Sequence, residues 1–411
     1  MKKRAKTVVA AVTLIGLAVL LWAWLGTEAS TANAAAAASA ANAASAAQAS
    51  AAGASAVPGG GTVSTGTGPY SAAGMQSRKE QLALWQGRYD RAEQIYASYR
   101  DATRYPYESR PIAEHPDQVR PFAPISEDLK LRNAKGEVVD GIHLRTSQER
   151  VFLSGKESVR FTLAAVDDNG NSLPLSVRNA SAQSIADTRT PVKNIQTNVS
   201  FSDDGMGADD IANDGSYSGR LTPSTQGFQS YSGTIRLLVE VASDSQQGVA
   251  QFDVVYTPDV PATWAGVREA LEAGSLNFYV KANVLVPGRY VVSGRVDDAN
   301  GTPFALVQFN DDVATGSREF KLQVFGALVL DKSPVFPLRL RDVDGFLLIP
   351  DKFPDRATMA RLSGVVYTSA SYPKSRFSSA EWNSEERQRY LTEYGHDADV
   401  ARHQVDDLSS N

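Results

Sequence analysis

The chain contains no cysteine, which excludes disulfide bonds, thiolate metal sites and a cysteine nucleophile. An excess of basic charge is also absent, since the chain has 41 lysines and arginines but 46 aspartates and glutamates, which gives a net charge of -5. Beyond the basic N-terminal end no basic run occurs, so we do not expect a surface that binds nucleic acid.

Sequence motifs of common hydrolases and phosphate-binding enzymes are missing as well. No Gly-x-Ser-x-Gly, His-Glu-x-x-His or Gly-x-x-x-x-Gly-Lys string occurs. Ser371 and Lys374 match a Ser-x-x-Lys string, but that chemistry needs both side chains on one helical turn, and Pro373 opposes a helix there. We therefore expect a protein that is not an enzyme, with an unrecognised hydrolase as the remaining catalytic alternative.

One long hydrophobic run stands at the N-terminus. Lysines and an arginine precede an uncharged segment, residues 7–26, of about 20 residues, the length that a helix needs to cross a bilayer core. Trp22 and Trp24 stand at its far end, where indole rings favour the membrane interface. We expect residues 1–26 to be a cytoplasmic basic end plus a transmembrane anchor; the alternative is a signal peptide cleaved near Ala32-Asn33-Ala34.

The next two segments differ sharply in composition. Residues 27–74 are mostly alanine, serine, glycine, threonine and asparagine, which predicts a disordered linker with too little apolar surface to fold. Residues 75–124 combine a helix over 76–102 with a proline-rich, extended strap. This amphipathic helix can pack on its own downstream domain or oligomerise through a short coiled coil. Its apolar face is formed by Leu82, Trp85, Tyr89, Ala92, Tyr96 and Tyr99, at alternating spacings of three and four residues.

From about residue 137 the apolar pattern alternates with a period of two, which is typical of β-strands. Seven short strands in about 120 residues predict an immunoglobulin-like β-sandwich over residues 125–260. A short helix, Trp264 to Leu271, and further strands predict a second sandwich over residues 261–370. The expected fold class is all-β, with two tandem immunoglobulin-like β-sandwich modules. Residues 371–411 form a polar C-terminal tail that is either a docking helix or a frayed end.

A repeated turn links the two modules. Residues 161–177 and 290–307 both contain a strand, an Asp-Asp-containing Asn-Gly turn and a return strand, which indicates an internal duplication of hairpins. Because the acids stand in the turns, we interpret them as turn formers rather than metal ligands. They are Asp167, Asp168, Asp297 and Asp298.

The strongest candidate site is an acidic loop within residues 201–223. Calcium takes six to eight oxygen ligands, and a glycine-containing loop with this many carboxylates can supply them. The spacing does not match the EF-hand loop, and Asp-Gly pairs also form ordinary hairpin turns, so both interpretations stay open. The candidate metal ligands are Asp203, Asp204, Asp209, Asp210 and Asp214.

The Asp-Asp-Asn-Gly hairpin, followed by the acidic loop and Gly215-Ser-Tyr-Ser-Gly219, resembles the choice-of-anchor X domain of bacterial surface and exported proteins. The resemblance covers roughly residues 137–370 and implies an exported sandwich of envelope proteins rather than a particular reaction. Because residues 371–411 carry neither a sorting motif nor an apolar anchor, the N-terminal tether favours the periplasmic face of a bacterial inner membrane. A cleaved N-terminus would instead make the protein secreted or periplasmic.

These observations leave a membrane-tethered, non-catalytic envelope protein as the first functional hypothesis. It would be a structural or protein-interaction module with an envelope protein as partner, and the helix over 76–102 would be a possible oligomerisation element. The second hypothesis is a calcium-stabilised module that binds a glycan or a cell-wall polymer. Its aromatic candidates for a sugar-binding face are Phe228, Tyr231, Tyr279 and Phe325.

Overall fold

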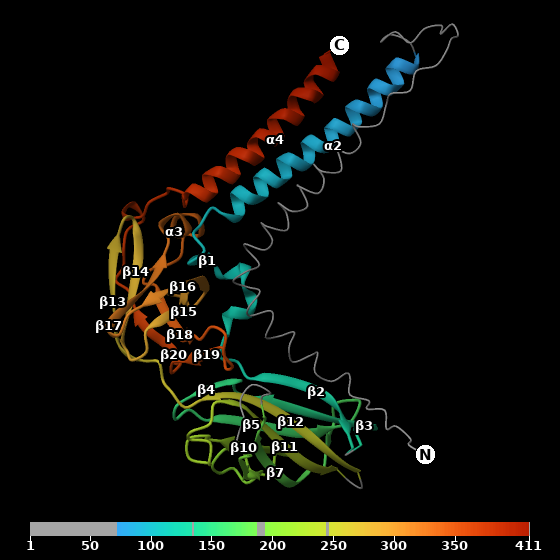
Figure 1. Ribbon diagram of the computed structural model, residues 1–411, viewed down its shortest axis with the longest axis vertical. Helices are drawn as coiled ribbons and strands as arrows, with labels where there is room; N and C mark the ends of the chain where they lie inside the picture. The colour runs from blue at the N-terminus through green and yellow to red at the C-terminus, as the bar shows by residue number, and fades with distance from the viewer. Residues whose placement is uncertain (1–71, 134, 187–193, 244–245, 411) are drawn as a thin grey trace, which may run out of the picture. The chain divides into compact units, whose positions relative to one another are not determined.

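The computed structural model describes residues 72–133, 135–186, 194–243 and 246–410 (Figure 1). The expected transmembrane anchor and the linker up to residue 71 lie outside these ranges. Within them, no helix is long and apolar enough to cross a bilayer. Strands are the main regular structure of these described residues, and the sheets pack in two sandwich-like pairs, each around its own apolar core.

The first sandwich follows the strap. One of its sheets has the order β2 (Ile125–Arg132), β3 (Val138–Gln148), β5 (Val159–Val166), β10 (Ser216–Leu221) and β9 (Phe201–Ser202), with β6 (Ser172–Leu173) also paired to β5. The other has the order β4 (Phe152–Ser154), β12 (Gln246–Thr257), β11 (Gly233–Ser243), β7 (Ser176–Ser184) and β8 (Gln196–Asn198). Every second residue of β5 points inward, and the rings of Phe161 and Phe252 meet with their centroids 4.8 Å apart. The period-two pattern therefore reflects burial of one face of each sheet.

The second sandwich packs a three-stranded sheet against a larger one (Figure 1). The three-stranded sheet has the order β13 (Ala262–Glu272), β14 (Ser275–Val284) and β17 (Gly316–Val324). The larger sheet has the order β1 (Ser109–Pro111), β16 (Pro303–Val313), β15 (Gly288–Asp297), β18 (Arg339–Leu348) and β19 (Arg356–Thr358), with β20 (Leu362–Thr368) also paired to β18.

The strap completes the second sandwich although it precedes the first in sequence. Ser109 to Pro111 pair antiparallel with β16, and the fully buried Ser109 side chain accepts a hydrogen bond from the Phe325 N–H at 2.9 Å. Two short 3-10 helices follow, Ile112–Glu114 and Pro116–Val119. The first sandwich is thus inserted, in sequence, between β1 and β13 of the second.

The prediction of a short helix from Trp264 to Leu271 is wrong. These residues belong to β13, which pairs antiparallel with β14, apart from a register shift between Trp264 and Gly266, around a tight turn at Ala273 and Gly274, both at positive φ. The Ala-Leu-Glu composition at the end of this segment favours a helix in isolation, but the preference is worth only a few tenths of a kcal/mol per residue. Pairing with a buried strand outweighs it, because strand preference depends mainly on packing.

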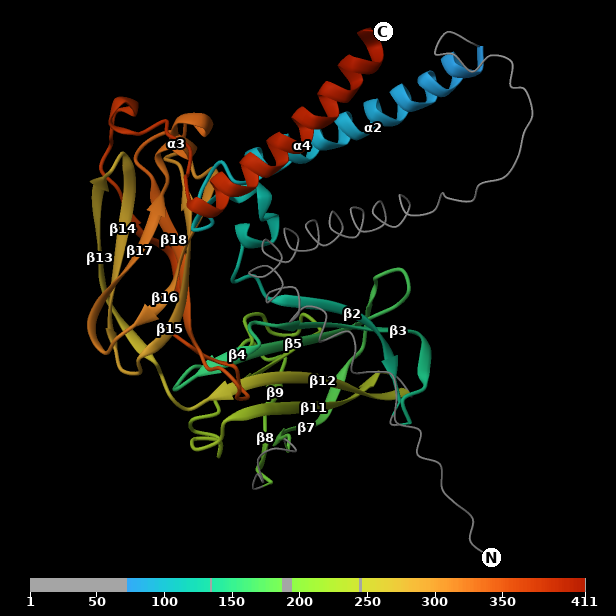
Figure 2. The same cartoon turned by 45° about the horizontal axis from the view of Figure 1, so that its top comes forward.

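The helix predicted over 76–102 is present as α2 (Ala72–Ala102), and α4 (Glu385–Ser410) lies beside it (Figure 2). The six residues of the expected apolar face of α2 are all half-buried. The ring of Tyr99 meets those of Tyr390 and Tyr394 with centroids 5.7 and 5.3 Å apart. Gly395 lies beside Tyr96, since an added Cβ would be 3.6 Å from that ring, an ordinary van der Waals contact. Tyr99 contacts Tyr390 and Tyr394, whereas Tyr96, earlier in α2, lies beside Gly395, later in α4. The two helices are therefore antiparallel.

The base of this helix pair is joined to the second sandwich. Asp331 lies on α3 (Gly326–Lys332) and accepts hydrogen bonds from Arg104 Nε at 2.8 Å and from the Tyr105 hydroxyl at 2.8 Å. Arg387, buried on α4, donates from Nε to Thr103 Oγ1 at 3.0 Å and from Nη2 to Glu381 at 2.6 Å. A further 3-10 helix, Lys374–Arg376, precedes α4.

The repeated turns are equivalent, with one change from the expected roles. Asp167 accepts hydrogen bonds from the Asn169 and Asn171 N–H groups, and Asp298 does the same for Asn300 and Thr302. Asp167 and Asp298 are therefore the turn formers. The other two acids of the repeat bind elsewhere: Asp168 contacts His143, and Asp297 pairs with Arg341.

Candidate metal centre

The acidic loop connects β9 to β10, two neighbouring strands of one sheet in the first sandwich. Ser202 pairs with Ser218 and Phe201 with Gly219, so the loop begins and ends at the same edge of the sheet. Gly219 is required there, because a Cβ at this position would lie 2.6 Å from the Phe201 ring. The hairpin thus gathers the acids of residues 203–214 into a small volume.

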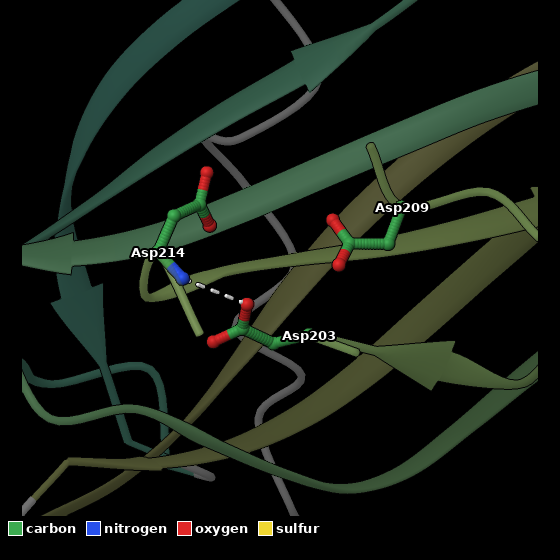
Figure 3. A group of neighbouring side chains, drawn as sticks. All are labelled: Asp203, Asp209 and Asp214. Carbon is green, nitrogen blue, oxygen red and sulfur yellow. Dashed lines mark hydrogen bonds between the residues drawn. The ribbon is translucent and has the colours of Figure 1, made fainter. Parts of the chain in front are cut away.

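Three of the five predicted ligands converge (Figure 3). Carboxylate oxygens of Asp203, Asp209 and Asp214 all lie within 4.8 Å of one another. Asp209 is buried, with 6% of its surface exposed, while Asp203 is half-buried and Asp214 is exposed. The cluster therefore has a closed inner side and an open outer side.

Backbone groups hold these carboxylates in place. Asp203 accepts hydrogen bonds from the N–H groups of Asp214 and Gly215, both at 3.1 Å, one to each carboxylate oxygen. Asp209 Oδ2 accepts from the Gly205 N–H at 2.6 Å. Gly205 and Gly215 have φ values of 70° and 81°, a region that glycine enters without the steric cost of a Cβ. The loop's glycines therefore allow the turns that bring the acids together.

The other two predicted ligands lie apart from this cluster. Asp204 accepts hydrogen bonds from the Met206 N–H at 2.9 Å and from the Ser202 hydroxyl at 3.0 Å, which makes it a turn former. Asp210 forms an ion pair with Arg160 of β5 at 2.5 Å. Arg160 also donates to Ser218 at 3.3 Å, so this guanidinium ties the loop to the sheet beneath it. The sequence did not indicate that Arg160 takes this role.

The donor set fits a calcium ion in part. Three carboxylates offer up to six oxygens, the lower limit of calcium coordination, and carbonyl oxygens or water usually complete such a shell. Hydrogen bonds from N–H groups use one lone pair on an oxygen and leave another available to a cation. The same bonds also explain the arrangement without a metal, as ordinary turn chemistry. The geometry therefore narrows the expected site from five residues to Asp203, Asp209 and Asp214.

A second titratable cluster, not expected from the sequence, lies on the outer face of the same sheet. His143 of β3 has Asp128 Oδ1 at 2.7 Å from Nδ1 and Asp168 Oδ1 at 3.0 Å from Nε2. Arg145 Nε donates to the other oxygen of Asp128 at 3.3 Å. The two carboxylates stand on opposite sides of the imidazole, so these three groups do not converge on a point that one metal ion could occupy.

The aromatic candidates for a sugar-binding face do not form one exposed surface. Phe228 and Tyr231 are core residues, with 0% and 4% of their surfaces exposed. The Tyr279 ring is covered by the guanidinium of Arg268, 4.0 Å from its centroid, and its hydroxyl donates to Glu272. Phe325 is half-buried and packs against the core of the second sandwich.

Comparisons with known proteins give no family for this chain. No protein-family model matches it, and no curated protein does. Among solved structures, it is similar to a DUF4785 family protein from Legionella pneumophila, with 12% identity and a TM-score of 0.37 over 55% of this chain; the chain spans 57% of that protein. Domains 5–6 of the S-layer protein SbsC match at 14% identity and a TM-score of 0.18, over 48% of this chain and 98% of that one.

Proposed function

We propose that the chain is a membrane-tethered, non-catalytic protein of the bacterial envelope that acts as a structural or protein-interaction module. In this proposal residues 7–26 anchor it in the inner membrane, the folded part is periplasmic, and both sandwiches are immunoglobulin-like. A choice-of-anchor X type of domain is the family that we propose.

The pairing of α2 with α4 is the observation that carries this proposal. An anchor at residues 7–26 would be followed by a linker and then by α2. Tyr99 of α2 packs against α4, and Arg104, directly after α2, binds Asp331 of the second sandwich. A pull on the tether would therefore be carried by half-buried aromatic and ionic contacts rather than by a free chain end. Such a connection suits a module that is held at a surface and presents its sandwiches to a partner.

Membrane fractionation tests the tether. The full chain is expected to sediment with membranes and to resist extraction at alkaline pH, whereas a variant lacking residues 2–26 should be soluble. A full chain that is found in the soluble fraction, with an N-terminus that sequencing places beyond residue 26, would contradict the anchor and support the signal peptide. Retention of the shortened variant in the membrane would contradict both.

The convergence of Asp203, Asp209 and Asp214 favours a second candidate function, a calcium-stabilised binding module for a glycan or cell-wall polymer. A ligand that binds only the folded state stabilises it by about 2.7 kcal/mol at a hundred times its dissociation constant. At about 2–4 °C per kcal/mol for a domain of this size, that corresponds to a rise in Tm of about 5–11 °C. We therefore expect calcium to raise the Tm of the full chain in detergent, relative to excess chelator.

Variants of the same loop separate a metal site from turn chemistry. Asp209→Asn should abolish the calcium-dependent shift, because it removes a charge from the buried side of the cluster. Asp210→Asn is the matched control, since Asp210 pairs with Arg160 outside the cluster, and it should retain the shift. A shift that is absent in the unaltered chain, or equal in all three proteins, would exclude calcium binding at this loop.

A further inference from the structure

Strand β2 forms an open edge of the first sandwich. It stands at the end of its sheet, paired only with β3 among the described strands, and seven of its eight residues are exposed. Ile125 and Leu129 are 43% and 52% exposed. An edge strand of this kind presents a row of unpaired N–H and C=O groups that can hydrogen-bond to another strand.

The two faces of β2 differ in polarity: the face toward the core carries Leu129, and the outer face carries Asp128 and Lys130. Leu129 stands opposite the buried Leu144 of β3, on the side of the sheet that faces the core. Asp128 stands opposite Arg145, and Lys130 opposite His143, on the outer side. The hydrogen bond from His143 lowers the pKa of Asp128, so this carboxylate is charged at neutral pH. An acid and a base two residues apart thus flank an exposed leucine at the free edge.

We propose that β2 pairs antiparallel with β2 of a second copy of this chain, with Leu129 opposite Leu129 across a two-fold axis. In an antiparallel pair, directly opposite residues lie on the same face of the sheet. A two-fold axis through position 129 meets this condition and sets Asp128 of each copy opposite Lys130 of the other. The two outer-face contacts are then opposite in charge, and the central contact joins two exposed apolar side chains.

Neighbouring registers lack this complementarity. A shift that keeps the faces matched moves the axis by one residue, to position 128 or 130. The first sets Asp128 opposite Asp128, and the second sets Lys130 opposite Lys130, and like charges directly opposite one another destabilise a strand pair. Charge on an edge strand usually prevents pairing, but here it selects one register of self-association. This proposal concerns β2 alone and does not depend on the membrane tether.

Because the chain has no cysteine, a single introduced thiol tests the register directly. Leu129→Cys in the full chain, in detergent, should form a disulfide-linked dimer under mild oxidation. Directly opposite residues have Cα atoms about 4.5–5.5 Å apart, which lies within the range that a disulfide spans. Ser126→Cys is the matched control. Its two copies would lie six positions apart along the pair, about 20 Å, and should not cross-link.

A second set of variants keeps the test decisive if Leu129→Cys disturbs the edge. Ser126→Cys and Arg132→Cys should each remain monomeric on a non-reducing gel, but a mixture of the two should form a mixed disulfide, since these positions are opposite one another. Lys130→Glu in the Leu129→Cys chain should lower cross-linking by about tenfold, because two like-charge contacts replace two opposite ones. Equal cross-linking at positions 126 and 129, or none in either set, would overturn the proposal. Equal cross-linking would favour association through another surface, such as α2.

Discussion

Removal of one aromatic ring should open the α2–α4 pair without unfolding the sandwiches. Tyr99 is the natural target because it meets two rings of α4, those of Tyr390 and Tyr394, in edge-to-face geometry. Each such contact is worth about 0.5–1.5 kcal/mol beyond area burial. The loss of partly buried apolar surface adds about 1 kcal/mol. Alanine's better helix propensity returns about 0.5 kcal/mol.

The net cost of Tyr99→Ala is therefore about 1.5–3.5 kcal/mol for local opening of the pair. Amide hydrogen exchange measures local opening, and a cost of this size corresponds to a loss of protection of about tenfold or more. We expect the loss in both helices, at residues 82–99 and 390–405, while the cores of the two sandwiches keep their protection.

Leu84→Ala is the matched control on the same helix, because Leu84 is 55% exposed and truncation removes little buried surface. Its exchange rates should match those of the unaltered chain within about twofold. Unchanged protection of α4 in the Tyr99→Ala chain would refute the reasoning, since it would mean that the aromatic contacts do not hold α4 in place.

Three further predictions concern the sandwiches. Gly248→Ala should lower the free energy of unfolding by about 1–3 kcal/mol in a denaturant titration, because the added Cβ would lie 2.2 Å from Leu131 Cδ1. An unchanged free energy of unfolding would show that β2 can shift to make room. Arg295→Met should cost about 1–3 kcal/mol by the same assay, since the guanidinium is 2% exposed and its loss leaves the carbonyl oxygens of Gln118 and Asp342 without this donor. Full stability would show that these contacts contribute little. Burial raises the pKa of Tyr290 to about 12. Its neutral phenol therefore stabilises the fold below its unfolded pKa of about 10, and this contribution is lost as the pH rises from about 10 through 12. Replacement by phenylalanine should flatten that part of the stability profile, and an unchanged profile would contradict the assignment.

The sequence predicted elements whose burial pattern is regular and local. All six residues of the apolar face of α2 were identified, because one face of a helix is visible as a three-and-four spacing. For its partner α4 the sequence left a docking helix and a frayed end open, since the buried face of that helix includes Arg387, a charge that is compatible with burial because it pairs with Glu381 and donates to Thr103. The strand β1 escaped prediction for a related reason. Its three residues pair with β16, nearly 200 residues away in sequence, and local composition carries no information about such a partner.

In the candidate site too, the sequence predicted the local features but not those that depend on tertiary packing. The sequence identified the acidic loop and its turns, because aspartate and glycine in such numbers have few other uses. It could not divide the five acids into ligands and others. Asp210 is withdrawn from the cluster by Arg160, which lies on a different strand, and Asp209 is buried only because the loop closes over it. Both facts depend on tertiary packing.

The side of the membrane on which the folded part lies is the most direct test of the proposed function. Ser98 is exposed on α2, and Ser98→Cys would place the only thiol of the chain there. Cells with a permeabilised outer membrane and an intact inner membrane would be treated with a maleimide that does not cross membranes. A periplasmic module predicts labelling before the inner membrane is lysed. Labelling that appears only after lysis would place the sandwiches in the cytoplasm and contradict the account.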